Sequence, residues 1–230
     1  MNNSVQTQFG YTTGGLAVER QRVLRNTYWL LALSLVPTVL GAWIGVATGL
    51  FRAMSPGMSM IVFFVGAFGL MFLVEKTKES AAGVASLLAF TFFMGLMLSR
   101  LVGFVLGFSN GTTLVMTAFG GTAAVFFAMA SLATVIKRDL SSWAKFLTVG
   151  AIVLMVAGIA NFFLQSSALM LTILVLMLGV FSAFMLYDIK RVVDGGETNY
   201  ISATLAIYLD LYNIFQSLLS LLGIFGGDRD

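Results

Sequence analysis

Long apolar stretches, separated by short polar or charged segments, are the main pattern along this chain. Within each stretch the apolar residues are continuous rather than alternating, which indicates helices and excludes the strands of a membrane β-barrel. A helix needs about 20 apolar residues to cross the hydrocarbon core of a membrane. Seven stretches predict an all-α, seven-helix membrane bundle: Tyr28–Leu50, Met58–Val74, Ala81–Ser99 (with an extension toward Phe108), Thr113–Ile136, Phe146–Phe163, Leu169–Tyr187 and Leu205–Phe225.

The composition agrees with a membrane protein. Of the 230 residues, 59% are hydrophobic and 10% are charged, whereas soluble domains are about 45–50% apolar and about 25% charged. The chain has no histidine and no cysteine, which excludes thiol nucleophiles, disulfides, zinc sites built from Cys and His, and Ser-His catalysis. The net charge of +3 needs no nucleic-acid partner, because the distribution of the basic residues between the loops accounts for it.

Basic residues gather in alternate connections, which sets the expected orientation. Short cytoplasmic loops of membrane proteins are enriched in Lys and Arg, so we expect the N-terminus in the cytoplasm. Three regions follow: a flexible cytoplasmic tail over residues 1–27, a transmembrane domain over residues 28–225 and a short periplasmic tail over residues 226–230. Ten of the 13 basic residues then lie in the cytoplasm: Arg20, Arg22, Arg25, Lys76, Lys78, Lys137, Arg138, Lys145, Lys190 and Arg191.

A ridge of small residues is expected to pack helices closely. Gly41, Gly45 and Gly49 lie four residues apart in the first predicted span. Such spacing lets helix backbones approach in lipid and gain van der Waals contact. We favour packing within one chain over a dimer interface.

Two carboxylates break the apolar pattern and are the main candidate functional residues. Asp210 lies inside the last predicted span. Asp188 closes the preceding one beside Lys190 and Arg191, where an interfacial aspartate without a special role is an equal alternative. An ionisable side chain in hydrocarbon costs about 2.5–3.5 kcal/mol on insertion scales, so it normally faces the bundle interior and has a partner. The short connection makes the two spans antiparallel, which predicts both carboxyls in the cytoplasmic half. If they meet, they cannot both ionise at low cost, so we expect a shared proton and a pH sensor that needs no histidine.

A polar stripe continues from Asp210 along the same predicted helix. Asn213, Ser217 and Ser220 follow at helical spacing and therefore share one face. Interhelical hydrogen bonds are one interpretation of such a stripe, and the lining of an ion path is the other. The carboxylate at one end favours the ion path.

Two further hypotheses concern what the aspartates bind. Lys76 and Lys78 lie in a loop on the same side and are candidate basic partners, although a solvated loop is the simpler interpretation. Calcium ions bind carboxylate and carbonyl oxygens, so Asp188 and Asp210 are also a candidate weak Ca²⁺ site. No other cofactor is expected.

Six segments carry motifs that can be compared with known proteins: VLRNTYWLLALS (Val23–Ser34), GLMFLVEKT (Gly69–Thr77), FGGTAAVFF (Phe119–Phe127), KRDLS (Lys137–Ser141), ANFFLQ (Ala160–Gln165) and GGETNYISATLAIYLDLYNIFQSLLSLLG (Gly195–Gly223). In order and position they resemble the Bax inhibitor-1 family, the transmembrane Bax-inhibitor-motif proteins, in its bacterial YccA-type branch. The last segment is the most specific, and the resemblance covers nearly the whole chain after about residue 20.

The resemblance implies a fold, a site and a partner. It implies six helices around a central seventh, in the bacterial inner membrane. In members that carry both carboxylates it implies a pH-sensitive di-aspartyl clasp gating a calcium leak, and Asp188 and Asp210 occupy those two positions. It also implies binding to the membrane AAA protease FtsH, for which the N-terminal tail would be a handle. The expected partners are therefore the lipid bilayer, an FtsH-type protease and Ca²⁺.

Two functions, neither of them enzymatic, follow from these observations. One is a regulator that binds FtsH and modulates its proteolysis, and the other is a pH-gated calcium or cation leak. A third alternative is an intramembrane aspartyl protease, because aspartates lie on two successive spans. The Gly-x-Gly-Asp motif of that class is replaced here by Ile207-Tyr208-Leu209-Asp210, and its Pro-Ala-Leu element is missing, which argues against it.

Overall fold

The computed structural model describes residues 3–50 and 53–227, with side chains from residue 18 onward, and within these ranges the chain forms seven long helices. Each of these helices is long and apolar enough to cross a membrane, and each coincides with one predicted span. The prediction of a seven-helix membrane bundle is confirmed. The helices are α1 (Asn3–Thr48), α2 (Pro56–Thr77), α3 (Ala81–Val105), α4 (Gly111–Val135), α5 (Trp143–Leu164), α6 (Ser167–Val193) and α7 (Tyr200–Gly226).

Helix α1 begins far ahead of the first predicted span. The sequence predicts a tail over residues 1–27, but the structure makes residues 3–27 part of α1. The helix continues because six of the seven residues from 19 to 25 are Glu, Gln, Arg or Leu, which are good helix formers. Val23 and Thr27 are also buried. Flexibility of this segment stays a prediction, as does the tail over residues 226–230, of which residues 228–230 lie outside the described part.

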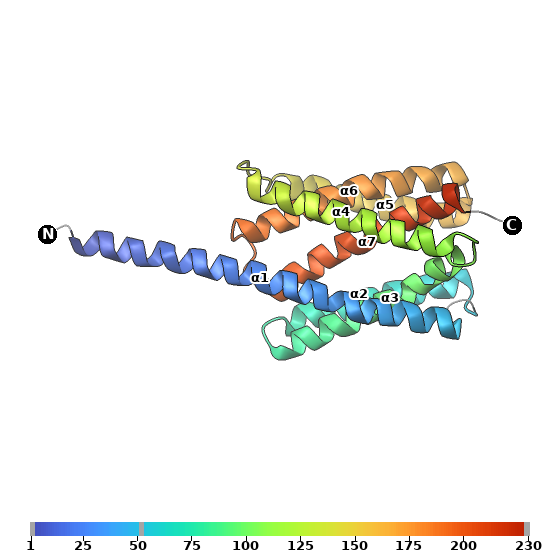
Figure 1. Cartoon of the computed structure of the whole chain (residues 1–230), viewed down its shortest axis with the longest axis horizontal. Coiled ribbons are helices and arrows are strands. Elements are labelled where there is room, and N and C mark those ends of the chain that lie inside the picture. Colours follow the sequence, from blue (N-terminus) through green and yellow to red (C-terminus); the bar gives the residue numbers. More distant parts are fainter. Residues whose placement is uncertain (1–2, 51–52, 228–230) are drawn as a thin grey trace.

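Helix α7 lies between two groups of helices (Figure 1). In one group α1 and α2 both pack on α3, and in the other α4 and α5 both pack on α6. Helix α7 contacts α1, α2, α3, α4 and α6, whereas α5 packs against α6 only, among the helices described here. Half of the most apolar stretch of α7 is buried, a larger share than in any other described helix. Five helices therefore contact α7, one fewer than the six that the resemblance implies.

Gly41 and Gly45 of the glycine ridge pack against α3 of the same chain, whereas Gly49 follows the end of α1 and a Cβ atom there would meet nothing within 4 Å. A Cβ atom at Gly41 would overlap the carbonyl oxygen of Phe92, and one at Gly95 in α3 would overlap the carbonyl oxygen of Thr38. Gly45 likewise meets the side chain of Ser99. The absence of side chains at these glycines lets the two backbones touch, as small-residue ridges do in lipid.

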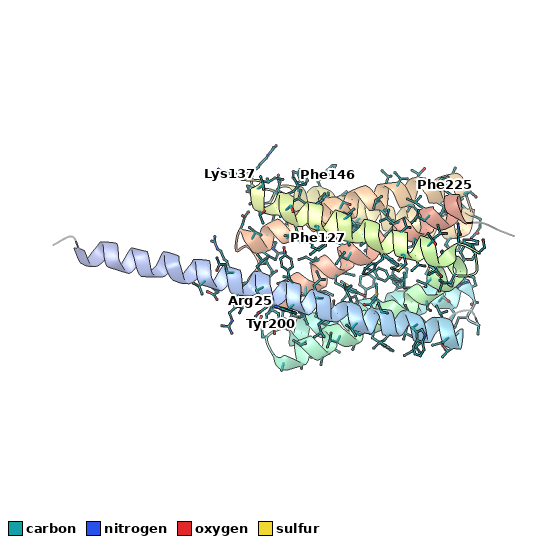
Figure 2. The ribbon with its side chains drawn as sticks, in the orientation of Figure 1. Arg25, Phe127, Lys137, Phe146, Tyr200 and Phe225 are labelled. Atoms are coloured by element: carbon teal, nitrogen blue, oxygen red, sulfur yellow. The ribbon has the colours of Figure 1, made fainter. Side chains whose placement is uncertain are left out.

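The two ends of the bundle differ in chemistry. Arg25, Lys137 and Tyr200 lie at the end from which α1 projects, and Phe225 lies at the opposite end (Figure 2). The α2–α3 and α6–α7 connections also meet at the first end, because the Asn199 side-chain amide donates to the carbonyl of Lys78 at 3.1 Å. We call this the basic end. Its assignment to the cytoplasm stays a prediction.

Candidate functional site

Asp188 and Asp210 meet between α6 and α7. Their carboxyl groups lie within hydrogen-bonding range of each other. Asp210 is only 3% exposed, and Asp188 is half-buried. The short α6–α7 connection makes the two helices antiparallel neighbours. Asp188 near the end of α6 and Asp210 in α7 therefore lie side by side although they are separated in sequence. We call the two residues the aspartyl pair.

The aspartyl pair is embedded in apolar surroundings. Ile189 on α6, and Ile207 and Ile214 on α7, are fully buried in the main core. One carboxyl oxygen of Asp210, Oδ2, has no hydrogen-bond partner among the described residues. Two carboxylates in contact in such a medium repel each other unless a proton or a cation lies between them. The arrangement can therefore respond chemically to protons or to cations.

The α6–α7 connection, next to the aspartyl pair, is a turn with several backbone hydrogen bonds. At the end of α6, Gly195 has a positive φ of 80°, and the N–H of Gly196 donates to the carbonyl of Arg191 at 2.8 Å. This is the Schellman pattern, in which a left-handed residue closes the last helical turn. At the start of α7, Asn199 Oδ1 accepts from the N–H groups of Ile201 at 2.8 Å and Ser202 at 3.1 Å. Both helices that carry the pair thus have fixed ends.

Charged residues of this turn lie near the pair. Arg191 Nη2 binds Glu197 Oε2 at 2.7 Å, and Glu197 Oε1 accepts from the N–H groups of Thr198 and Asn199, each at 3.0 Å. Arg191 and Glu197 are the charged neighbours of Asp188 besides Asp210. The electrostatic environment of the pair is therefore set by its own turn.

The structure does not bring Lys76 or Lys78 to the aspartates. Lys78 forms an ion pair with Glu75, whose hydrogen bond raises the pKa of the Lys78 ammonium. Lys76 is exposed. The α2–α3 connection instead contacts the first turn of α7, where Ser202 Oγ donates to Glu75 Oε2 at 3.4 Å. The two lysines thus lie at the solvated end of α2, Lys76 in its last turn and Lys78 just after it, which agrees with the simpler of the two interpretations.

The polar stripe of α7 is bonded mainly within its own helix. Asn213 Nδ2 donates to the carbonyl of Leu209 at 2.7 Å, and Ser217 Oγ donates to the carbonyl of Asn213 at 2.7 Å. Ser217 and Ser220 are buried, and only Asn213 of the three borders a groove described below. Their role in an ion path stays a prediction.

Tyr208 is a site residue that the sequence analysis missed. Its hydroxyl lies 2.8 Å from Thr38 Oγ1 on α1 and donates to the carbonyl of Thr91 on α3 at 3.4 Å. It therefore joins α7 to the first helix group, two residues before Asp210. The sequence did contain an indication of this contact, a tyrosine within an apolar helix, because the hydroxyl of a buried tyrosine usually has a hydrogen-bond partner.

A deep apolar groove also escaped the sequence analysis. It has a volume of about 1130 Å³ and opens between α2 and α3 on one side and α5 and α6 on the other. Leu209, Tyr212, Asn213 and Gln216 of α7 form its floor. The groove arises because the two helix groups meet through α7 rather than through direct contacts of α2 or α3 with α5.

The aspartyl pair offers few ligands for a resident calcium ion. Ca²⁺ takes about six to eight oxygens, and two carboxyl groups provide at most four. No third acidic side chain joins Asp188 and Asp210 in a cluster within the described residues. Water or carbonyl oxygens would have to complete the shell, which fits a passing ion better than a bound one.

Comparisons with known proteins give consistent matches over nearly the whole chain. The family model described as inhibitor of apoptosis-promoting Bax1 matches residues 20–227. The "Modulator of FtsH protease YccA" of Escherichia coli K12 is 39% identical over 207 residues, which cover 90% of this chain and 92% of that protein. An uncharacterised protein of Pseudomonas aeruginosa is 39% identical over 216 residues, 92% of this chain and 95% of its own. An uncharacterised membrane protein of Vibrio cholerae is 36% identical over 207 residues, 90% of this chain and 91% of its own.

Proposed function

Because the chain belongs to the Bax inhibitor-1 family, we propose that it is a membrane-embedded modulator of an FtsH-type protease. It is a multi-pass inner-membrane protein, with seven helices that can span the bilayer in its described part. The observation that carries the proposal is that a relative named for FtsH modulation aligns over most of both chains. An alignment of that extent covers all seven helices rather than one shared motif.

Co-purification tests this role. The tagged full-length chain, extracted in mild detergent, is expected to retain the FtsH-type protease of its own cell, and deletion of the gene is expected to speed the turnover of FtsH substrates in the membrane. A variant lacking residues 2–17 is expected to insert normally but to bind the protease less, since a polar N-terminal segment suits a protease that needs a starting handle. Absence of the protease from the eluate, together with unchanged substrate turnover, would contradict the proposal.

We infer a second function for the aspartyl pair, a pH-sensitive cation leak. Its support is the contact between Asp188 and Asp210 in an apolar core, where one oxygen of Asp210 has no partner among the residues that the structure describes. With one shared proton, the pair is a hydrogen-bonded clasp between α6 and α7. Without the proton, the two charges repel each other or attract a cation such as Ca²⁺. Proton loss would thus loosen the clasp and favour ion entry.

Flux through reconstituted vesicles tests the leak. Asp188→Asn and Asp210→Asn keep the volume and a hydrogen-bonding side chain but cannot lose a proton, so each is expected to make Ca²⁺ flux independent of pH. Asp139→Asn is the matched control, because Asp139 is an exposed carboxyl in the α4–α5 connection. Flux that keeps its pH dependence in both pair variants would exclude the gate.

We also propose that the basic end faces the cytoplasm, as the enrichment of Lys and Arg there supports. The chain has no cysteine, so a single introduced thiol can be labelled without background. Lys76→Cys is expected to resist a membrane-impermeant maleimide in intact cells, whereas Ala53→Cys at the opposite end is expected to react. The reverse pattern would invert the assignment.

A further inference from the structure

The groove between the two helix groups is open to the lipid phase. Phe68 on α2, Phe104 on α3 and Ile152 on α5 border it and are among the exposed large apolar side chains. Much of the remaining wall is methionine and phenylalanine, for example Met71 and Met155. Methionine is flexible and polarizable and adapts to irregular apolar ligands. In a membrane, such a groove is filled by acyl chains or by another helix.

One end of the groove carries a cation. Arg100 of α3 borders the groove and is the one basic residue between positions 81 and 108. Its guanidinium donates to Ser59 Oγ of α2 at 3.4 Å. Within the described part of the chain, no Asp or Glu forms an ion pair with Arg100. The groove therefore joins a long apolar wall to an exposed cation that no carboxylate neutralises.

The position of Arg100 matches a membrane interface. Ser59 lies in the first turn of α2 and Arg100 near the end of α3, which places both away from the α2–α3 connection and therefore away from the basic end. Arginine at such a depth extends its charged group to the level of the lipid headgroups. A guanidinium at that level can bind the phosphate of a lipid headgroup through two parallel N–H donors.

The length of the groove favours a lipid over a helix. The bordering residues run from Met94 to Phe104 on α3 and from Thr148 to Phe162 on α5, which is about 15–21 Å at 1.5 Å per residue. One leaflet contributes about half of the roughly 30 Å hydrocarbon core. A transmembrane helix of a partner would need the full thickness, whereas the acyl chains of one lipid need one leaflet.

We propose that this groove binds one phospholipid from the leaflet opposite the basic end, with its acyl chains against the Met and Phe walls and its phosphate on Arg100. Gln216 at the floor offers an amide group for the ester oxygens of the lipid. The proposal depends on neither FtsH binding nor ion leak.

Native mass spectrometry of the full-length protein in detergent tests the headgroup contact. We would titrate it with dioleoylphosphatidylglycerol and, separately, with dioleoylglycerol, which has the same chains and no phosphate. The wild type is expected to prefer the phospholipid roughly tenfold, the effect of one charge-assisted contact. Arg100→Gln is expected to lose this preference, and Arg100→Lys to keep part of it because the charge remains. Equal affinity of the wild type for both lipids would overturn the proposal.

A pair of glycine variants tests the location. A Cβ atom at Gly158 or at Gly179 would meet no atom within 4 Å, so the two positions are alike in local crowding, but only Gly158 borders the groove. Gly158→Phe is expected to reduce phospholipid binding at least about tenfold, and Gly179→Phe to leave it unchanged, with circular dichroism confirming the helical fold of both. Phospholipid binding by Gly158→Phe at wild-type affinity would refute the site. A photocrosslinker at Phe68 that captures a protein helix instead of lipid would also refute it.

Discussion

Tyr208 is one of the residues that bond α7 to the first helix group. Its hydroxyl contacts Thr38 Oγ1 at 2.8 Å in a part of the bundle that is shielded from water. We expect Tyr208→Phe and Thr38→Val to show a coupling energy of about 0.5–1.5 kcal/mol in a double-mutant cycle, the net value of a buried hydrogen bond. Unfolding in mixed micelles measures it. Additive effects of the two substitutions would show that the contact contributes nothing to stability.

The sequence predicted the partners of some residues and not of others. The meeting of Asp188 and Asp210 was predictable, because an isolated acid in an apolar helix needs a partner and the short connection allows one candidate. Lys76 and Lys78 do not lie beside the aspartates, since sequence position gives the side of the membrane but not the lateral place around the bundle. The neighbouring charge comes instead from Arg191, one turn beyond Asp188.

At the scale of elements, the contact between α1 and α3 depends on missing side chains. We expect Gly95→Ala to destabilise the protein by about 1–3 kcal/mol, the usual cost of overpacking, because the new methyl group would overlap the backbone of Thr38. Gly120→Ala is the matched control, since a Cβ atom there meets nothing within 4 Å. The midpoint of unfolding in mixed micelles distinguishes the two. Equal stability of both variants would mean that α1 and α3 can shift apart to accommodate the methyl group without a loss of stability.

The connection between α4 and α5 should respond to acid. Ser141 donates to Asp139 through its N–H and its hydroxyl, each at 2.8 Å, and these bonds lower the pKa of Asp139. A carboxyl group whose pKa is lowered in the folded state stabilises the turn when the pH is above its ordinary pKa of about 3.9. That stabilisation is lost as the pH falls through the lowered pKa of the folded state. Ser141→Ala is expected to raise the pKa of Asp139 toward the ordinary value.

Carboxyl carbon chemical shifts of Asp139, followed by NMR during a pH titration, measure this change. Ser142→Ala is the control, because it leaves both donors of Ser141 in place. A pKa of Asp139 that is the same in the wild type and in Ser141→Ala would show that the backbone N–H alone sets it.

The existence of the helices was predictable, but their ends were not. A count of apolar residues finds the part of a helix in hydrocarbon, whereas helical hydrogen bonding continues through charged interfacial residues. Helix α6 accordingly continues to Val193, beyond the predicted end of its span at Tyr187, and α7 starts at Tyr200 rather than Leu205. The Asn199 cap at α7 was readable from its residue type, because Asn is a preferred N-cap.

At the scale of the whole molecule, α7 couples two helix groups that otherwise touch little. Contacts link α1 with α6 and α3 with α4, but α2 and α5 do not contact each other across the groove. If the two helix groups moved apart, the distance between α2 and α5 would therefore increase most. The groove that permits it could not be predicted from sequence, because apolar runs do not specify which helices become neighbours.

Distances between spin labels can follow such a spread. Val65 on α2 and Val149 on α5 are both exposed, and cysteines placed there carry labels without background in a chain that lacks cysteine. If the aspartyl pair holds the groups together through a shared proton, raising the pH is expected to lengthen the mean distance by at least about 1–2 Å, the scale of interfacial helix shifts. Asp210→Asn should abolish the increase in distance, since asparagine has no ionisable proton at this position.

Labels at Val39 on α1 and at Val65 report on a distance within one group and should show no change with pH. A lengthening in both label pairs would mean that the bundle loosens as a whole and not at α7. Identical Val65–Val149 distances at acidic and alkaline pH would instead mean that proton loss at the pair is absorbed locally, by Arg191 or by water. The clasp would then act on the passage of ions between α6 and α7 without moving the two groups apart.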